Sequence, residues 1–498
     1  MSAALVLTSC TLPPNPMTLD ERAAEATSDI NDIYSKQEPL RGPLTLSQAF
    51  ARALKYNLDA RTKMMEETLA QNDLDLSRID LLPKAVASAG YNTRNVVDAS
   101  SSRSVLTNQQ SLEPSTSSDI NRRSADLTLS WNILDFGVSY ITARQQGDRQ
   151  LVAQEQRRRV VQSLMADVRR AFWRAASAQK LSKKVNDAIR AAEAALPSAR
   201  KAESEALRSP VDSLRYQKLL LDLLRQLEAV ERLLATSKTE LAALINLPTG
   251  QAFTIAVPKG RAGLESIPLR VRDMEEVALL LNPDIREMSY QRRISVDESR
   301  KALLKLLPGI GVSYSPNYDS NGFLVHNYWT LGTARVSGFL NNVIQAPYQI
   351  RRAESAEVLA DERRKAVSVA VLAKLHIAFA QYVSAAREYR WSDQLADVDD
   401  RLYEQIGNRA SSDVQSELER ISAQVSAVNS ELRRDQSYAE AQAALGRIYA
   451  TMGLDPVADA ATKLDVKDLS REIQKTMRDW RKIRARSLLS TAEAEPAQ

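Results

Sequence analysis

The residues best placed to act on charge are two aspartates, Asp212 and Asp413, each of which begins a helical stretch directly after a turn. Each turn also contains an arginine, Arg208 in the first and Arg409 in the second, which could bridge the carboxylates. Aspartates at such positions either cap a helix start or, where several copies of a chain meet, form a ring that attracts cations. The sequence leaves both roles open.

A second candidate for chemistry is the single cysteine, Cys10, which excludes an intrachain disulfide. It follows the short apolar run Ala3–Leu7 as Leu7-Thr8-Ser9-Cys10, the pattern of a bacterial lipoprotein processing site, although the start lacks the basic residues of a signal peptide. We expect lipidation at Cys10; the alternative is an incidental thiol in a tail. No phosphate loop, nucleophile elbow or metal cluster is present, so we expect no catalytic site, no cofactor and no metal.

The charge and apolar composition of the chain limits the kinds of partner that it can bind. The 67 basic and 62 acidic residues are interspersed, which is typical of solvated helices and does not indicate nucleic-acid binding. The cluster Arg157-Arg158-Arg159 lies among acidic neighbours and is expected to be solvated as well. No run approaches the roughly 18 apolar residues of a transmembrane helix, so contact with a membrane would have to use strands or a lipid.

The elements that would position these groups begin with a strand at Ala125–Gly137. Its apolar residues alternate with polar ones, which predicts one apolar and one polar face. From Val138 to Leu196 there is no proline, which predicts a helix of about 59 residues, roughly 90 Å long, that Pro197 should kink or break. A leucine repeats every seventh residue from Leu220 to Leu241, which indicates helix packing.

The same order of elements then returns. Asn57 and Asn282, like Pro83 and Pro308, are 225 positions apart, and the later landmarks Leu247 and Leu454 are 207 apart. The offset falls because the second polar loop is shorter. The chain is therefore a tandem duplication.

The predicted organisation is as follows: 1–18 signal, lipobox and tether; 19–44 N-terminal segment; 45–250 first repeat (helix, strand hairpin 85–136, long helix 138–207, helix 211–246); 251–270 connector; 271–456 second repeat (helix, strand hairpin 309–340, long helix 346–406 opening at Ala346-Pro347, helix 413–452); and 457–498 C-terminal tail with a short amphipathic stretch. Each repeat begins with one helix that continues to the Leu-Pro pair.

Four strands with one apolar face cannot close on themselves, and an open edge is not tolerated in lipid. Membrane barrels need about eight strands or more, and three chains would supply twelve. The fold class expected is therefore mainly α with a transmembrane β-barrel portion, in which a trimeric 12-stranded barrel continues into an α-helical barrel.

These features resemble the outer-membrane efflux protein family, the TolC-type channels of Gram-negative bacteria. The resemblance covers about Thr45 to Leu454 and depends on the duplicated plan, the Leu-Pro before each first strand, the segment Leu129–Gly137 and the Ala171-Phe172-Trp173 sequence. It implies a trimeric duct in the outer membrane that reaches into the periplasm. Its implied partners are a periplasmic adaptor (membrane fusion) protein and an inner-membrane RND or ABC transporter, in efflux or type I secretion.

By the same resemblance, the two turns form a periplasmic aperture that contacts the adaptor, with the residues Arg208, Ser209, Pro210, Asp212, Asn408, Arg409 and Asp413. The family's usual glycine in the first turn is replaced by Ser209-Pro210. The duct itself would perform no catalysis. The competing interpretation is a periplasmic coiled-coil scaffold or adaptor protein, whose strands form a small domain.

The residues expected to face lipid are those on the apolar strand faces: Leu127, Leu129, Trp131, Ile133, Ile310, Val312 and Tyr314. The aromatic residues Tyr91, Trp131, Tyr314 and Trp329 would form a girdle at the lipid boundary; ordinary packing within the sheet is favoured almost as strongly.

Overall fold

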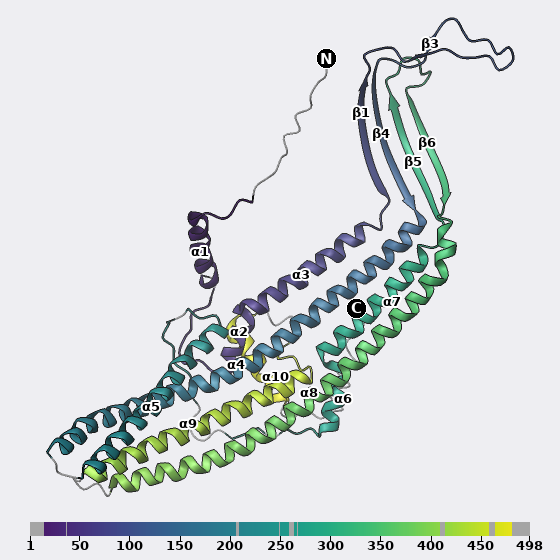
Figure 1. Cartoon of the computed structure of the whole chain (residues 1–498). Coiled ribbons are helices and arrows are strands. Elements are labelled where there is room, and N and C mark those ends of the chain that lie inside the picture. Colours follow the sequence, from purple (N-terminus) through teal and green to yellow (C-terminus); the bar gives the residue numbers. More distant parts are fainter. Residues whose placement is uncertain are drawn as a thin grey trace.

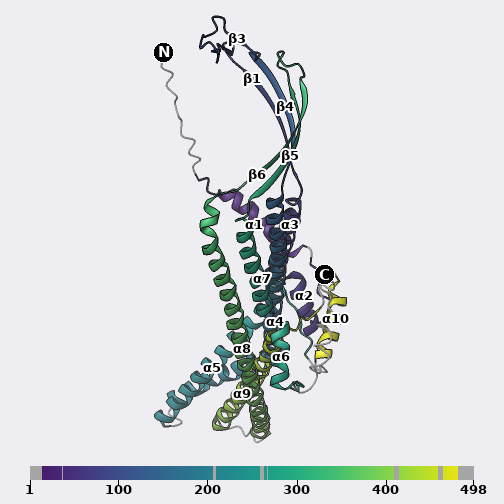
Figure 2. The ribbon, with the colours of Figure 1, turned by 90° about the vertical axis from the view of Figure 1, so that its right-hand side faces the viewer.

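The structure is a computed structural model that describes residues 14–35, 37–205, 209–248, 250–257, 263–265, 267–408, 414–457 and 464–480. The molecule is elongated, with a curved antiparallel sheet at one end and long helices leading away from it to a distant tip (Figure 1). Figure 2 shows the strands continuing directly from the tops of the helices.

The element order repeats as the sequence predicts. The helices are α1 Leu19–Tyr34, α2 Leu46–Tyr56, α3 Leu58–Ile79, α4 Ile133–Ser204, α5 Pro210–Leu244, α6 Val271–Leu281, α7 Pro283–Leu304, α8 Asn341–Asn408, α9 Val414–Thr451 and α10 Val466–Trp480. The strands are β1 Lys84–Thr93, β2 Ala99–Ser100, β3 Ser115–Thr116, β4 Asn121–Asn132, β5 Gly309–Asp319 and β6 Tyr328–Ser337.

The long helices form one curved layer. The helix α4 packs against α3 and α5 on one side and against α7 and α9 on the other, and α8 packs against α7 and α9 (Figure 1). The order across the layer is therefore α3 or α5, then α4, then α7 or α9, then α8. The outermost members are α3 and α5 at one edge and α8 at the other.

The first helix of each repeat is broken, where one continuous helix was predicted. Asn57 ends α2 and caps α3 by accepting a hydrogen bond from the Ala60 N–H at 3.2 Å. Asn282 does the same between α6 and α7, accepting from the Asp284 N–H at 2.9 Å. An asparagine side chain that caps the next helix lets the chain change direction without leaving its N–H groups unpaired.

The two long helices are longer than predicted. The 72 residues of α4 begin at Ile133, because the Asn132 side chain accepts hydrogen bonds from the N–H groups of the first turn. Pro197 lies inside α4 and does not break it. The neighbouring Ala195 and Ala199 are buried in the interface with α5 and α9, and this packing holds the helix together around the lost hydrogen bond. Likewise Pro347 lies within α8, which begins at Asn341.

Three apolar clusters hold the helices together. The largest joins α2, α4 and α10, a second joins α4, α5 and α9, and the third joins α6, α7, α8 and α9. The predicted leucine repeat is confirmed, since Leu220, Leu227, Leu234 and Leu241 are all buried. The helical body is therefore stabilised mainly by contacts between helices, as expected for helices of this length.

The segments outside the repeats are also helical. The helix α1 was not predicted; none of its residues is buried, and its signal in the sequence is the capping box of Thr18 with Glu21. The amphipathic stretch expected in the tail is α10, which buries Leu469 and Ile473 in the cluster with α2 and α4. The tail beyond Trp480 lies outside the described residues.

The sheet has the strand order β1-β4-β5-β6, with every neighbouring pair antiparallel. Several predicted bounds were wrong. Strand β4 begins at Asn121 rather than Ala125, the polar loop contains the short pair β2 and β3, and β5 continues through Pro316 to Asp319. The pairing of β5 with β4 is interrupted at Ser315 and Pro316, because proline has no N–H to donate.

One helix among the described residues, α8, is long and apolar enough to cross a membrane by length and composition alone. Only 22% of its most apolar window is buried within the chain. The sequence therefore does contain an apolar window of this length, contrary to expectation, and most of it is exposed on α8 at the edge of the helical layer.

Candidate functional site

The sheet has two chemically different faces. Residues directly opposite each other in neighbouring strands share a face, so the register defines rows across the sheet. One row joins Ala85, Leu129, Tyr314 and Gly332, and the next joins Lys84, Ser130, Ser313 and Thr333. Apolar and polar rows alternate in this way down the strands, as the sequence predicts.

The residues expected on the apolar face are exposed in the single chain: Leu127, Leu129, Trp131, Ile310, Val312 and Tyr314. They share one face by register, with Trp131 opposite Val312 and Leu129 opposite Tyr314. Ile133 is exposed too, but it is the first residue of α4 and not part of a strand, which corrects its assignment. The ring of Trp131 meets that of Phe136 edge to face at 5.7 Å.

The opposite face is lined by hydroxyl, amide and charged groups that bond across the strands. The Thr128 hydroxyl lies 2.9 Å from a carboxylate oxygen of Asp126 and 3.0 Å from the Ser315 hydroxyl. On β4 the side chains of this face are less exposed than those of the apolar face, as expected if the sheet is concave on its polar side.

Trp329 does not share a face with Tyr314, so these two aromatic residues cannot belong to one girdle. Trp329 pairs with Asn317, which pairs with Asp126, and all three lie on the polar face. Counting alternate residues back from Arg335 and Thr333 would have placed Trp329 on this face from the sequence. The aromatic residue that β6 presents on the apolar face is Tyr328, whose ring lies 4.7 Å from that of Tyr318.

A second group missed from the sequence links the two hairpins at the far end of the sheet. Arg122 of β4 forms an ion pair with the buried Asp319 of β5. Asn321 accepts a hydrogen bond from the Asp119 N–H at 3.0 Å and donates one to the Ser117 carbonyl at 2.9 Å. These contacts join residues from separate repeats, and no local spacing in the sequence predicts them.

The tip of the helical layer contains the predicted aperture residues, in part. Ser209 precedes α5, Pro210 is its first residue, and Asn408 ends α8. Asp212 lies in the first turn of α5 with an exposed carboxylate 3.7 Å from the Arg215 guanidinium. The N-cap of α5 is Ser209, so Asp212 is not the capping residue. Arg208, Arg409, Asp413 and Cys10 lie outside the described residues.

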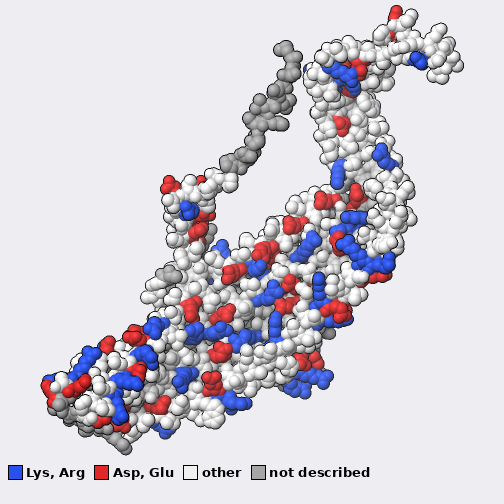
Figure 3. Space-filling view, in the orientation of Figure 1, with Lys and Arg blue, Asp and Glu red and all other residues white. Residues whose placement is uncertain are grey.

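The basic cluster on α4 forms ion pairs between elements rather than an open patch. Arg157 contacts Glu67, Arg158 contacts Asp455, and Arg159 contacts Asp284 and Glu287. Glu155, almost fully buried, is held by Arg158 and by Arg286 of α7. Burial raises the pKa of Glu155 despite these two guanidinium groups. Figure 3 shows basic and acidic groups interspersed along the helices, and few of either on the visible part of the strands.

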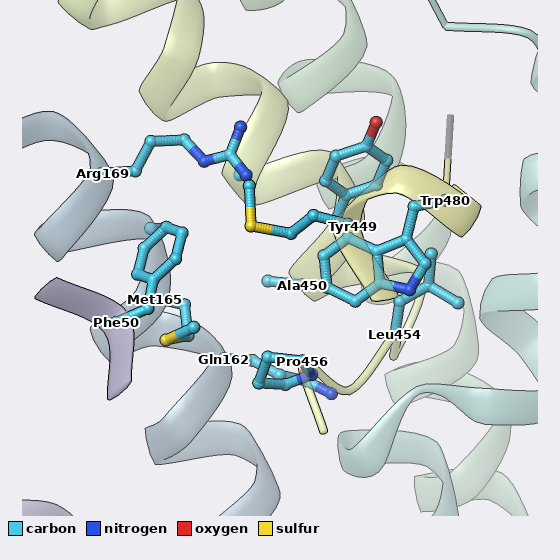
Figure 4. Close-up of a pocket in the computed structure, with 12 residues that line it drawn as sticks. Phe50, Gln162, Met165, Arg169, Tyr449, Ala450, Leu454, Pro456 and Trp480 are labelled. Atoms are coloured by element: carbon cyan, nitrogen blue, oxygen red, sulfur yellow. The ribbon is translucent and has the colours of Figure 1, made fainter. Parts of the chain in front are cut away.

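Two cavities among the described residues differ in size and lining. One, among α4, α9 and α10, is lined by Phe50, Met165, Arg169, Tyr449 and Trp480 (Figure 4) and has a volume of about 20 Å³. That is room for about one water molecule. Another, of about 410 Å³, lies where the sheet meets the helices and is lined by the cations Lys84 and Arg335 and by the carboxylates Asp80 and Asp135. Within the described ranges, no three His, Cys, Asp or Glu residues are grouped to hold a metal.

Comparison with known proteins gives a consistent result for the fold. No protein-family model and no curated protein matches the chain by sequence. Among solved structures it is similar to the outer membrane protein VceC from Vibrio cholerae, with a TM-score of 0.60, 13% identity, and coverage of 82% of this chain and 96% of VceC. It is also similar to the Campylobacter jejuni CmeC outer membrane channel, with a TM-score of 0.61, 14% identity, and coverage of 89% and 95%.

A third similar structure is the open state of the Neisseria gonorrhoeae MtrE outer membrane channel, with a TM-score of 0.58, 18% identity, and coverage of 80% of this chain and 88% of MtrE. The chain therefore has the fold of outer-membrane channels. More narrowly, this is the TolC-type fold of outer-membrane efflux proteins, as the duplicated sequence suggests.

Proposed function

We propose that this protein is a passive exit duct in the outer membrane, serving a tripartite efflux or type I secretion system. The observation that carries the proposal is the open, two-faced sheet. Its strands β1 and β6 are the edge strands, and its apolar face is exposed in the single chain. A sheet of this kind is stable in lipid only when it closes, with the apolar face outward and the polar face around a lumen.

The helical layer supports closure with further copies of the same chain. On α9, Ile421 and Val428 are 0% and 2% exposed in the cluster with α4 and α5. Their counterparts 207 positions earlier on α5, Leu214 and Leu221, are 54% and 50% exposed. One edge of the layer thus carries the same apolar pattern that α9 buries.

The other edge carries the matching surface. On α4, Ala188 and Ala195 are buried on the face of Lys184, which contacts Glu431 of α9. Their counterparts on α8, Leu395 and Leu402, are exposed. The α8 helix of one copy can therefore pack against α5 of the next copy, as α4 packs against α9 within the chain. Three copies would supply twelve strands, so we propose a homotrimer.

Conductance and solubility test the duct. The full chain, extracted from outer membranes in detergent and placed in a planar lipid bilayer, should pass a steady ionic current. It should run as a trimer by native mass spectrometry. A chain that stays in the soluble fraction without detergent and gives no current would overturn the proposal and favour a periplasmic scaffold.

We further propose that the tip forms the periplasmic aperture and contacts a periplasmic adaptor, itself coupled to an inner-membrane transporter. The exposed Asp212 at the tip supports a carboxylate ring, to which Asp413 would add a second. Replacing both residues by alanine should lower the preference for cations in the bilayer. Unchanged ion selectivity would reject the carboxylate rings and leave the duct itself standing.

Finally, we propose that Cys10 is lipidated, with the segment up to Thr18 as a tether. The sequence around Cys10 supports this. Metabolic labelling with a fatty acid analogue should mark the wild-type protein and not the Cys10→Ser variant. Equal labelling of the two proteins, or none of either, would contradict lipidation at this residue.

A further inference from the structure

Three large apolar side chains lie on the otherwise polar face of the sheet. They are Trp329 and Leu331 of β6 and Val86 of β1, and all three are exposed. Their row partners are polar: Asn317 lies opposite Trp329, Ser315 opposite Leu331, and Thr128 opposite Val86. In the single chain Trp329 is 42%, Leu331 53% and Val86 54% exposed.

Closure of the sheet into a ring would place the two β6 residues at a joint between copies. Because β6 and β1 are the two edges of the sheet, closure places β6 of one copy beside β1 of the next. Trp329 and Leu331 then line each joint between copies on the side that faces the lumen, whereas Val86 lies near the helix end of β1. In the proposed duct Trp329 and Leu331 interrupt a wall of hydroxyl and amide groups near the outer mouth, because Tyr328 begins β6 directly after the loop.

A carboxylate lies in the same row as the indole. Asp126 of β4 is opposite Asn317 of β5, which is opposite Trp329. Two strand spacings put the main chains of Asp126 and Trp329 roughly 10 Å apart. Asp126 accepts a hydrogen bond from Thr128 and, among the described ion pairs, has no cationic partner, whereas the nearby Arg122 is paired with Asp319.

We propose that Trp329, Leu331 and Asp126 form a binding subsite for amphiphilic organic cations on the inner wall of the duct. The indole face attracts a cation and, with Leu331, covers apolar surface, while Asp126 supplies the opposite charge. A solute with an apolar body and a positive charge fits both features at once, and its anionic analogue fits only the apolar one. The inference rests on the proposed function, whose substrate class it names.

The test compares two probes of the same shape and opposite charge. The full chain in a planar bilayer is titrated with tetraphenylphosphonium and, separately, with tetraphenylborate, while the potassium current is recorded. We expect tetraphenylphosphonium to block the current more strongly. Trp329→Ala should weaken that block about tenfold, and Trp329→Phe should retain most of it. The matched control is Tyr328→Ala, which removes the neighbouring aromatic ring from the opposite face and should leave the block unchanged.

A second variant keeps the proposal testable if Trp329→Ala does not assemble. Asp126→Asn should weaken the block by tetraphenylphosphonium and not that by tetraphenylborate. Suppose the wild type passes current, but both variants are blocked as strongly as the wild type, or the block does not depend on the sign of the probe. The subsite is then overturned and the duct remains. If the wild type passes no current, the proposed function itself fails.

Discussion

The side-chain amide of Asn282 donates a hydrogen bond to the main-chain carbonyl of Thr451, 169 residues along the chain, at 2.8 Å. The first repeat has the same contact, from Asn57 to the Leu244 carbonyl at 3.1 Å. In each repeat one asparagine therefore caps one helix at its start and pairs a free carbonyl near the end of another. The two repeats therefore share the same asparagine contact.

Removing this asparagine contact should destabilise the helical body. Asn282→Ala loses both a cap and a partly buried hydrogen bond, which we expect to lower the free energy of unfolding by about 1–3 kcal/mol. Asn282→Asp keeps the capping oxygen but cannot donate to Thr451, so its loss should be intermediate. Thermal unfolding of the detergent-solubilised chain, followed by circular dichroism, measures both. Equal melting temperatures for the three proteins would contradict this role.

Gly453 lies just after the end of α9 in a left-handed conformation, with φ of +75°. A side-chain carbon there would come within 2.2 Å of the Leu281 carbonyl oxygen. We therefore expect Gly453→Ala to destabilise the chain by about 1–3 kcal/mol or more, measured in the same melting experiment. The counterpart in the first repeat is Asn246, with φ of +54°. As the control, Asn246→Gly relieves the left-handed backbone but loses the hydrogen bond that the side chain donates to the Ile33 carbonyl at 3.3 Å, so its net change should be smaller than that of Gly453→Ala. A Gly453→Ala variant that melts like the wild type would show that the backbone relaxes freely here.

The repeat also predicts an ion pair between copies. Within the chain, Arg286 of α7 lies 2.8 Å from Glu155 of α4. Their counterparts are Arg61 of α3 and Glu362 of α8, which have the same residue types, lie at opposite edges of the helical layer and are exposed. Arg61→Glu and Glu362→Arg should each weaken association by about 1 kcal/mol per contact between copies. The trimer fraction in native mass spectrometry should fall accordingly.

The double variant with both charges exchanged should recover the trimer. Arg272→Glu, an equal change of charge on α6, should leave assembly unaltered. If the exchange does not restore what the single changes lose, Arg61 and Glu362 do not meet.

Glu431 should make the α4–α9 contact sensitive to acid. It is buried and lies 2.8 Å from Lys184 and 3.6 Å from Lys180. Burial alone would raise its pKa, but the hydrogen bond from Lys184 and the charges of both lysines outweigh burial and hold the pKa below its usual value of 4.5. A carboxyl with a lowered pKa stabilises the folded chain above the pKa of the unfolded state, and the contribution disappears as the pH falls through the folded pKa.

We therefore expect the melting temperature of the wild type to fall more steeply than that of Glu431→Gln between about pH 5 and pH 3. At neutral pH the variant should be less stable by about 1–3 kcal/mol. The exposed Glu419, on the same helix, provides the control Glu419→Gln. Parallel acid curves for wild type and Glu431→Gln would argue against this contribution.

The sequence predicts the parts of this fold that follow a period. The two faces of β4, the leucine repeat of α5 and the duplication follow from the spacing of apolar residues and are all present. The break at Asn57 was missed because apolar residues continue at helical spacing on both sides of it. The break depends on the hydrogen bond from Asn57 to the Leu244 carbonyl near the end of α5. Local sequence patterns do not predict a contact between residues so far apart in the chain.

The site was predictable to a similar extent. Alternation identified the apolar strand residues, but it could not place Ile133, where a side-chain cap from Asn132 starts the helix. The wrong face was implied for Trp329 because its aromatic character was weighed above its position in the strand. The ion pair of Arg122 with Asp319 depends on the register between two hairpins almost two hundred residues apart, and that register emerges only from folding.

The interface of α4 with α9 joins the two repeats inside one polypeptide. Because its two sides are tethered, it forms at an effective concentration that does not depend on how much protein the cell makes. In the proposed trimer only half of the joints around the helical wall then require an encounter between molecules. Fusing the repeats also lets each evolve separately, and the unequal loops that follow β1 and β5 are one such divergence.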